Sequence, residues 1–366
     1  MSRIDLELAS GVTRPATAPI RVLIVDDSPM VRRMLSQCLA AQPDIEVVGT
    51  AAEPFEAREL MVRQKPDLIT LDLEMPRMHG LEFLARIMKH RPMPVIVISS
   101  LTQAGSSAAL EALRLGAVEV LAKPDGPESV GLLRRTLPDT VRAVARARLG
   151  LAPREHAAPV APAAATGTPS QVLIAIGAST GGVEALSSLI PALPAQCPGI
   201  LIAQHIPPVF SRSFSERLDQ ISALTVKEAA EGDIIRDGFV YVAPGDYHLT
   251  ITVRQGRFVA QLDHGPRVCY QRPSVDVLFR SVARAAGTSA TAALLTGMGA
   301  DGASGLKLLH SIGCHTIAQD EATSVVWGMP GEAHKLGAAS EVLPLGRIAQ
   351  RLLDLSRTLA PCPNLR

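Results

Sequence analysis

The sequence predicts a two-domain α/β protein, and three observations support that fold class. From residue 20 to about 140, apolar runs typical of buried strands alternate with segments that repeat apolar residues at helical spacing. This alternation predicts a doubly wound, five-stranded parallel sheet. Residues 141–170 are Ala/Pro-rich, which is typical of a linker. Over residues 171–360 the alternation resumes, and we expect an α/β domain with a mostly parallel sheet and a hairpin section.

Composition limits the classes of function that fit. The 366 residues are enough for two hydrophobic cores, and 47% of them are hydrophobic. A net charge of +1 gives no electrostatic case for binding nucleic acid. The five cysteines are odd in number and lack zinc-ligand spacing, so we expect reduced thiols in a cytoplasmic protein. The sequence has no apolar run of membrane-spanning length, and we expect no membrane insertion.

The elements of the first domain follow in order. Uninterrupted or alternating apolar runs predict five strands, at 20–25, 46–51, 67–72, 93–100 and 117–122. Apolar residues at helical spacing predict the intervening helices, at Pro29–Ala40, Pro54–Gln64, Gly80–Lys89 and Ser106–Leu115, with a last helix at Ser129–Leu149.

Chemically useful side chains follow the strands of this domain. Asp26 and Asp27 follow the first strand, Asp72 the third, Ser99 the fourth and Lys123 the fifth. The carboxyl ends of parallel strands meet at one edge of a sheet, so we expect these residues to converge there. Grouped carboxylates suit Mg²⁺, which can screen a carboxylate that attacks phosphorus. The lysine and the hydroxyl can then contact the phosphoryl oxygens.

The motifs VDDS, LDLEMP followed by MHG, VISS and LAKP resemble, in this order, the response-regulator receiver domain. The resemblance implies that Asp72 is the phosphoryl acceptor. The two aspartates after the first strand would bind Mg²⁺ together with it. Lys123 would contact the phosphate, and the switch hydroxyl would be that of Ser99, with its neighbour Ser100 as the alternative.

The second domain shows the same alternation. Seven strands are predicted, at 172–177, 199–205, 239–244, 248–253, 258–263, 291–296 and 315–320. Helical patterns cover Gly182–Ile190, Phe210–Gln220, Val275–Ala286, Gly302–Ile312 and Pro330–Leu336. The turns APGD and RQGR join runs rich in β-branched residues, which predicts the hairpin section at about 239–262.

The segment from Val172 to Gly182 carries the pattern of a nucleophile elbow. A buried strand runs into a glycine-rich turn and then a helix, and Gly177, Ser179 and Gly181 fill the spacing G-x-S-x-G. The glycines allow a tight turn and a close approach of substrate. The alternative is a tight turn that cradles a phosphate group.

A nucleophilic serine needs a base, and the base needs an orienting carboxylate. His205 follows the next strand along the chain, which places it at the same edge of the sheet as Ser179. Asp301 and Asp320 both follow later strands. Periodicity does not choose between these two aspartates.

The second domain resembles the chemotaxis protein-glutamate methylesterases. It contains GASTGG, AQHIP, RPSVDVLF, LLTGMGADGA and AQDEATSVVWGMP in the order found in that family. The resemblance implies that Ser179 is the nucleophile, His205 the general base and Asp301 the orienting acid. It further implies that the Met298 backbone amide serves the oxyanion hole and that Thr180 flanks the nucleophile.

The two resemblances together imply a phosphorylation-activated esterase of chemotaxis adaptation. Its partners would be methyl-accepting chemotaxis receptors as substrate and a chemotaxis histidine kinase as phosphodonor. It would hydrolyse glutamyl methyl esters with release of methanol, and would also deamidate glutamines. Mg²⁺ would serve the receiver domain alone, and the esterase would need no cofactor.

Two readings from other classes remain beside this one. In the first, GASTGG is a dinucleotide-binding turn of a nicotinamide enzyme, although Ser179 then replaces the middle glycine of G-x-G-x-x-G. In the second, the domain is a phosphorylation-controlled binding module without chemistry, although all three residue types of a triad are present.

Overall fold

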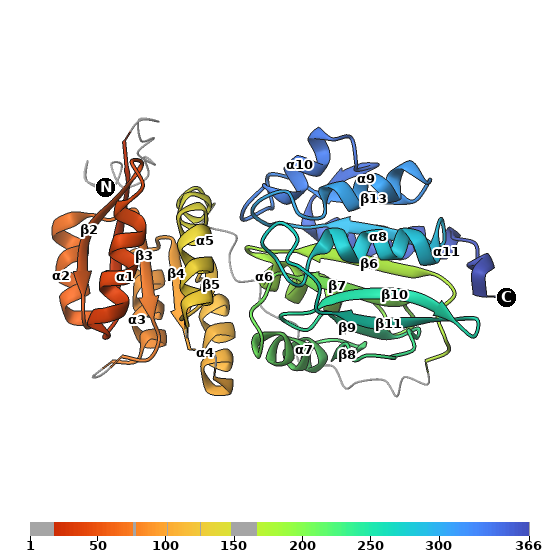
Figure 1. Ribbon diagram of the computed structural model, residues 1–366, viewed down its shortest axis with the longest axis horizontal. Coiled ribbons are helices and arrows are strands. Elements are labelled where there is room, and N and C mark those ends of the chain that lie inside the picture. Colours follow the sequence, from red (N-terminus) through yellow and green to blue (C-terminus); the bar gives the residue numbers. More distant parts are fainter. Residues whose placement is uncertain (1–17, 76–77, 101, 125, 148–166, 366) are drawn as a thin grey trace, which may run out of the picture.

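The structure is a computed structural model that describes residues 18–75, 78–100, 102–124, 126–147 and 167–365. It contains two α/β units that lie side by side, with the N-terminal one on the left of Figure 1. Most of the predicted linker, residues 148–166, falls outside the described residues, so its limits stay a prediction. Among the described helices, none combines the length and the hydropathy needed to cross a membrane.

The N-terminal unit is the doubly wound sheet that the sequence predicts. Its five parallel strands lie in the order β2-β1-β3-β4-β5. The strands are β1 (Ile20–Val25), β2 (Ile45–Ala51), β3 (Leu68–Asp72), β4 (Val95–Ser99) and β5 (Glu119–Ala122). The helices are α1 (Pro29–Ala40), α2 (Pro54–Gln64), α3 (Gly80–His90), α4 (Gln103–Arg114) and α5 (Pro127–Ala145).

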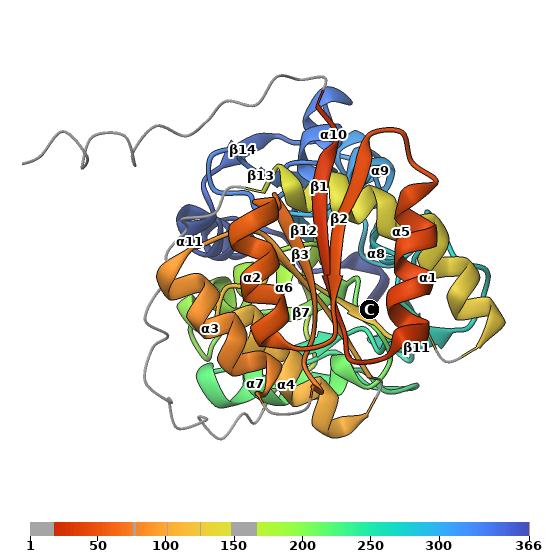
Figure 2. The ribbon, with the colours of Figure 1, turned by 90° about the vertical axis from the view of Figure 1, so that its left-hand side faces the viewer.

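Helices cover both faces of this sheet, as Figure 2 shows with the unit facing the viewer. On one face, α1 and α5 pack Leu35 and Leu137 against Ile24. On the other, α2, α3 and α4 pack against Leu23 and its neighbours. The inner strands β1, β3 and β4 are buried on both faces, which explains why their sequences are mostly apolar.

The C-terminal unit is built on a seven-stranded sheet in the order β14-β13-β12-β6-β7-β9-β8, with all its pairings parallel. Its strands are β6 (Leu173–Ala178), β7 (Gly199–Gln204), β8 (Thr225–Glu228), β9 (Phe239–Val242), β12 (Ala290–Leu294), β13 (His315–Gln319) and β14 (Glu341–Leu343). The hairpin β10 (His248–Arg254) and β11 (Arg257–Asp263) forms a separate antiparallel pair.

Helices cover this sheet on both sides as well. They are α6 (Gly182–Leu189), α7 (Phe210–Ile221), α8 (Val275–Ala286), α9 (Ala303–Ser311), α10 (Met329–Lys335) and α11 (Leu345–Thr358), with short 3₁₀ turns at Ile190–Ala192 and Pro363–Leu365. Helices α6, α7 and α11 share one apolar core with one face of β6. Helices α8, α9 and α10, together with the hairpin, cover the other face.

The hairpin section is smaller than the sequence predicts. The run at 239–244 was expected to belong to it, but β9 pairs in parallel with β7 and β8 in the main sheet. The APGD turn therefore leads from the sheet into the hairpin instead of joining two hairpin strands. The prediction also missed β8 and β14, which are short edge strands of the sheet without a continuous apolar run.

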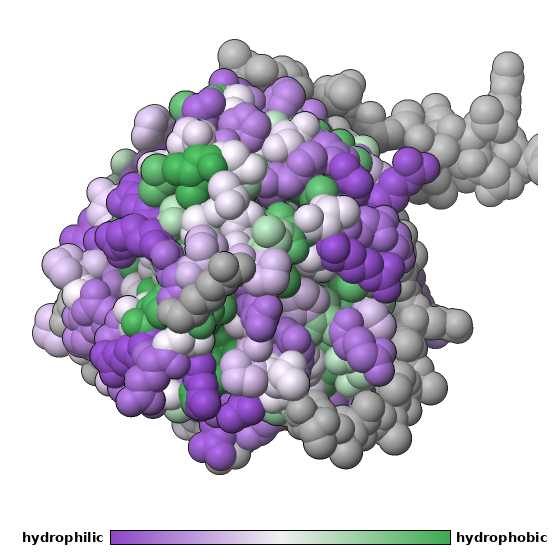
Figure 3. All heavy atoms as spheres, turned by 90° about the vertical axis from the view of Figure 1, so that its right-hand side faces the viewer, coloured by the Kyte–Doolittle hydropathy of each residue, from purple (hydrophilic) through white to green (hydrophobic). Residues whose placement is uncertain are grey.

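The two units meet through α4 of the first and α6 and α7 of the second. Leu110 and Leu113 of α4 belong to the same apolar cluster as Phe210 and Phe214 of α7. At the opposite end of the molecule, the described residues visible in Figure 3 are mainly hydrophilic, with small hydrophobic patches between them. The first unit therefore covers the α6–α7 side of the second.

Candidate active site and phosphoacceptor site

Ser179 lies in a tight turn between β6 and α6. Its amide donates to the Thr296 carbonyl at 3.0 Å, and its own carbonyl accepts from the amide of Gly182. Gly181 has a φ of 75°, a left-handed conformation that glycine adopts without strain. Strand β6 is where the strand order reverses, since β7 lies on one side of it and β12 on the other. Such switch points form the ligand-binding crevices of parallel sheets.

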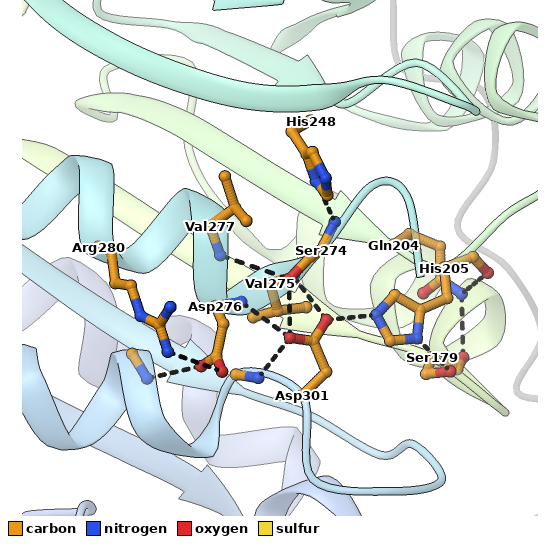
Figure 4. Close-up of polar contacts among 12 residues, drawn as sticks. Ser179, Gln204, His205, His248, Ser274, Val275, Asp276, Val277, Arg280 and Asp301 are labelled. Atoms are coloured by element: carbon orange, nitrogen blue, oxygen red, sulfur yellow. Dashed lines mark hydrogen bonds and ion pairs between the residues drawn. The ribbon is translucent and has the colours of Figure 1, made fainter. Parts of the chain in front are cut away.

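His205 bridges Ser179 and Asp301 (Figure 4). Its Nδ1 lies 3.0 Å from the Ser179 Oγ, and its Nε2 lies 2.7 Å from Asp301 Oδ2. A carboxylate only accepts hydrogen bonds, so Nε2 carries the proton and Nδ1 is free to accept from the serine. The turn at Ser179 thus has a base in contact with its hydroxyl, which favours a nucleophile over a phosphate-cradling turn.

The Asp301 carboxylate is buried and accepts hydrogen bonds from five groups. Burial acts to raise the pKa of this carboxyl, but the hydrogen bond from His205 and the backbone donors outweigh it, so the pKa lies below its ordinary value. Asp301 therefore stays ionised beside the histidine. The donors are His205 Nε2, Ser274 Oγ and the amides of Val275, Asp276 and Gly302.

Geometry separates the two aspartates between which periodicity could not choose. Asp320 lies after β13, and its Oδ1 accepts from the amide and the hydroxyl of Thr323 at 2.9 and 2.6 Å. Asp320 therefore stabilises the loop that follows β13, whereas Asp301 contacts His205.

The turn after β12 approaches Ser179 closely. A Cβ on Gly297 would come within 2.7 Å of the Ser179 Cβ, so only glycine fits there. Met298 follows it and is half-buried. Thr180 is buried, and its carbonyl accepts from the Thr296 hydroxyl at 3.0 Å. Thr180 and Met298, the two residues that the resemblance places beside the nucleophile, thus both lie next to the contact between the Ser179 turn and the Gly297 turn.

Gln204 is a site residue that sequence reasoning missed. Its buried side-chain amide donates to the Ser179 and His205 carbonyls, each at 3.0 Å, so it ties the ends of β6 and β7 together. A glutamine directly before the candidate base is the only signal in the sequence, and it does not reveal which carbonyls the amide reaches.

Ser179 and His205 open into a cavity of about 820 Å³ that lies between the two units. Its wall on the catalytic side includes Val183 and Phe210, and Leu110 and Leu113 of α4 close it from the other unit. Residues of both units therefore line the space in front of Ser179.

The first unit brings its acidic residues together as predicted. Carboxylate oxygens of Asp26, Asp27 and Asp72 lie within 4.8 Å of one another, an all-oxygen set that suits Mg²⁺. Lys123 Nζ lies 2.8 Å from Asp72 Oδ2 and 3.3 Å from Asp26 Oδ2. Burial raises the pKa of Asp26. Burial acts to lower the pKa of Lys123, but its contacts with Asp72 and Asp26 raise it.

The two candidate hydroxyls of the switch differ in environment. Ser99 ends β4 and is fully buried, and its Oγ donates to the Gly105 carbonyl in α4 at 3.4 Å. Ser100 is half-exposed and donates to Glu74 at 2.8 Å. Ser99 also faces Ala122 across the β4–β5 pairing, directly before Lys123.

The fold and the two sites define a class of protein. One unit is a phosphoacceptor sheet, and the other carries a Ser–His–Asp constellation of the kind used in acyl transfer. This is a response regulator with a hydrolase as its output domain.

Comparisons with known proteins identify the family. Residues 22–131 match the response regulator receiver domain, and residues 174–352 match the CheB methylesterase domain. The protein-glutamate methylesterase/protein-glutamine glutaminase 4 of Anaeromyxobacter dehalogenans is 50% identical over 348 residues, which cover 93% of this chain and 97% of the relative. The corresponding protein 2 of Pseudomonas aeruginosa is 49% identical over 344 residues, which cover 92% and 97%.

A solved structure agrees with these relatives. The crystal structure of the Thermotoga maritima CheB methylesterase catalytic domain is 41% identical, with a TM-score of 0.50, and the match covers 51% of this chain and 99% of that one. The chain belongs to the CheB family of protein-glutamate methylesterases/protein-glutamine glutaminases.

Proposed function

We propose that this protein hydrolyses glutamyl methyl esters on methyl-accepting chemotaxis receptors, and that phosphorylation of Asp72 activates it. The observation that carries the proposal is the hydrogen-bonded sequence Ser179–His205–Asp301, which opens into a cavity that the receiver unit covers. Family membership supplies the substrate class. Occlusion of Ser179 by the receiver would give a receiver and a hydrolase a reason to share one chain.

The acylation step follows from the geometry. Ser179 Oγ attacks the ester carbonyl carbon while its proton passes to His205 Nδ1, 3.0 Å away. Asp301 stabilises the imidazolium through the Nε2 proton. His205 then gives the proton to the methoxy oxygen, the carbon–oxygen bond breaks, and methanol leaves. The glutamyl group is left as an ester on Ser179.

Water completes the cycle at the same atoms. A water molecule gives a proton to His205 Nδ1 as it attacks the glutamyl ester, and that proton returns to the Ser179 oxygen as the enzyme ester breaks. A glutamine side chain can pass through the same tetrahedral intermediate, with ammonia as the leaving group. The protein would thus also be a protein-glutamine deamidase.

The oxyanion of each tetrahedral intermediate needs donors near Ser179. The Met298 backbone amide is our candidate, because the turn that carries it packs directly on Ser179. Thr180, next to the nucleophile, flanks the same space.

Regulation is assigned to the receiver unit. Asp72 would accept a phosphoryl group from a chemotaxis histidine kinase, with Asp26, Asp27 and Asp72 holding the Mg²⁺ that screens charge during the transfer. Lys123 already pairs with Asp72 and would contact the phosphoryl oxygens. Ser99 would donate to one of them.

A coupled assay tests the proposal. Methanol release from a methylated chemoreceptor is measured with the full chain, with and without a small-molecule phosphodonor and Mg²⁺. We expect slow basal release, faster release with the phosphodonor, and none from Ser179→Ala. Unchanged release by Ser179→Ala would refute the mechanism, and a response to phosphodonor that survives Asp72→Ala would refute the assigned acceptor.

A further inference from the structure

The candidate triad acid is held by the start of a helix. Asp301 Oδ2 contacts His205, while its Oδ1 accepts from the Ser274 hydroxyl at 2.8 Å. Ser274 is the N-cap of α8, and the next two backbone amides also donate to the same carboxylate. Donors at a helix N-terminus favour a negative charge. Apart from His205, Ser274 is the side-chain donor among the five groups that contact the Asp301 carboxylate.

Ser274 is held in turn by a second buried histidine. The Ser274 amide donates to His248 Nδ1 at 3.1 Å, and His248 Nε2 lies 3.0 Å from the Pro266 carbonyl oxygen. The carbonyl only accepts, so Nε2 carries the proton and Nδ1 is the acceptor. The contacts therefore assign His248 one neutral tautomer. It is 1% exposed at the start of β10.

The groups form one continuous series across the active site, as Figure 4 shows. Hydrogen bonds link His248 to Ser274, Ser274 to Asp301, Asp301 to His205 and His205 to Ser179. The members come from β10, the N-cap of α8 and the turns after β12, β7 and β6. The hairpin, which stands apart from the main sheet, thus reaches the catalytic edge through His248.

We infer that His248 and Ser274 are positioning residues that act on the reaction through Asp301. The inference rests on the proposed role of Asp301 as the orienting acid. Neither residue contacts the reacting atoms. Without His248 the N-cap of α8 loses a fixed partner. Without the Ser274 hydroxyl, Asp301 Oδ1 keeps only the amides of Asp276 and Gly302 as donors, so the carboxylate is held less firmly toward His205. A misplacement of about 1 Å in a catalytic group can cost roughly 10²-fold in rate.

Two substitutions of His248 separate positioning from packing. His248→Gln can keep both hydrogen bonds, because its amide oxygen can accept from Ser274 and its amide nitrogen can donate to Pro266. His248→Leu fills similar space and keeps neither bond. We expect kcat for methanol release to fall about 10–100-fold in His248→Leu and to stay within about threefold of wild type in His248→Gln.

The measurement uses the full chain activated with phosphodonor. We expect KM to be unchanged in His248→Leu, because the lost contacts do not face the substrate. Ser274→Ala should lower kcat by a similar factor, and the double variant should be no slower than the slower single one, since both act through Asp301. His310→Leu is the matched control, because that histidine contacts Ser340 beyond the triad, and its kcat should equal that of wild type.

Melting temperatures show whether each variant is folded. Wild-type kcat in folded His248→Leu would overturn the inference, as would a loss confined to KM or a folded His248→Gln as slow as His248→Leu. These outcomes differ from failure of the proposed function, in which wild type itself releases no methanol or Ser179→Ala releases as much as wild type.

Discussion

Reversing one charge on α4 should raise the basal activity of the protein. Arg114 lies on the face of α4 that closes the Ser179 cavity, and it interacts electrostatically with Glu184 of α6 in the catalytic unit. Arg114→Glu replaces this attraction between the units by a repulsion. The receiver should then uncover the cavity more often, without any change at Ser179.

The size of the effect follows from the exposure of the pair. The side chains of Arg114 and Glu184 are 46% and 33% exposed, so each attraction or repulsion is worth at most about 1 kcal/mol. Losing the attraction and gaining the repulsion therefore shifts the docking free energy by at most about 2 kcal/mol, or roughly 30-fold in the docking equilibrium. While the docked form predominates, the basal rate rises by the same factor.

Methanol release by the unphosphorylated full chain measures the rise. Arg114 also pairs with Glu111 on its own helix, so Arg86→Glu on α3 is the control, because it breaks the similar exposed pair with Glu82. Adding Glu184→Gln to Arg114→Glu should reverse much of the rise, since the repulsion disappears. Basal activity equal to that of the control would refute the docking geometry.

Three further predictions test the sites themselves. Ser179→Ala should lower turnover on the order of 10⁶-fold with its melting temperature retained, and half the wild-type release would exclude it as nucleophile. Asp301→Asn should cost roughly 10⁴ in kcat and Asp320→Asn far less, so the opposite ranking would show that the wrong acid was chosen. Asp72→Ala should stay at basal activity with phosphodonor, whereas a fragment starting near Ser170 should need none. Phosphorylation should activate the wild type about 5–150-fold, and a fragment as slow as the unphosphorylated chain would rule out occlusion.

Much of the fold could be predicted because its strands are buried on both faces. Residues 22–25 of β1 and 173–176 of β6 are continuous apolar runs, and each strand is followed by a helix of regular period. The same alternation of apolar strands and helical segments predicts that Ser179, His205 and Asp72 lie at strand ends. Strand β8 has no such run, because it lies at the edge of the sheet and only Val226 of its four residues is buried.

The parts that sequence could not supply depend on contacts between distant elements. Spacing left Asp301 and Asp320 equal. The family resemblance selected Asp301, and the hydrogen bond to His205 gives the physical reason. His248 had no obvious partner in the sequence, because Ser274 and Pro266 reach it from other segments. The docking of α4 on α7 likewise could not be predicted from the spacing of apolar residues, since each helix has an ordinary amphipathic face.

In the proposed activation, we expect the contacts of Ser99 to carry the effect of a phosphoryl group on Asp72 toward the Ser179 cavity. The Ser99 hydroxyl has one proton, which it donates to the Gly105 carbonyl in the first turn of α4. A phosphoryl group on Asp72 adds acceptor oxygens beside Ser99 and Lys123. The single proton cannot serve both acceptors, so donation to the phosphoryl group releases Gly105. We therefore expect phosphorylation to remove this contact at the end of α4 opposite Arg114, and α4 is the helix that packs on α6 and α7 beside the Ser179 cavity.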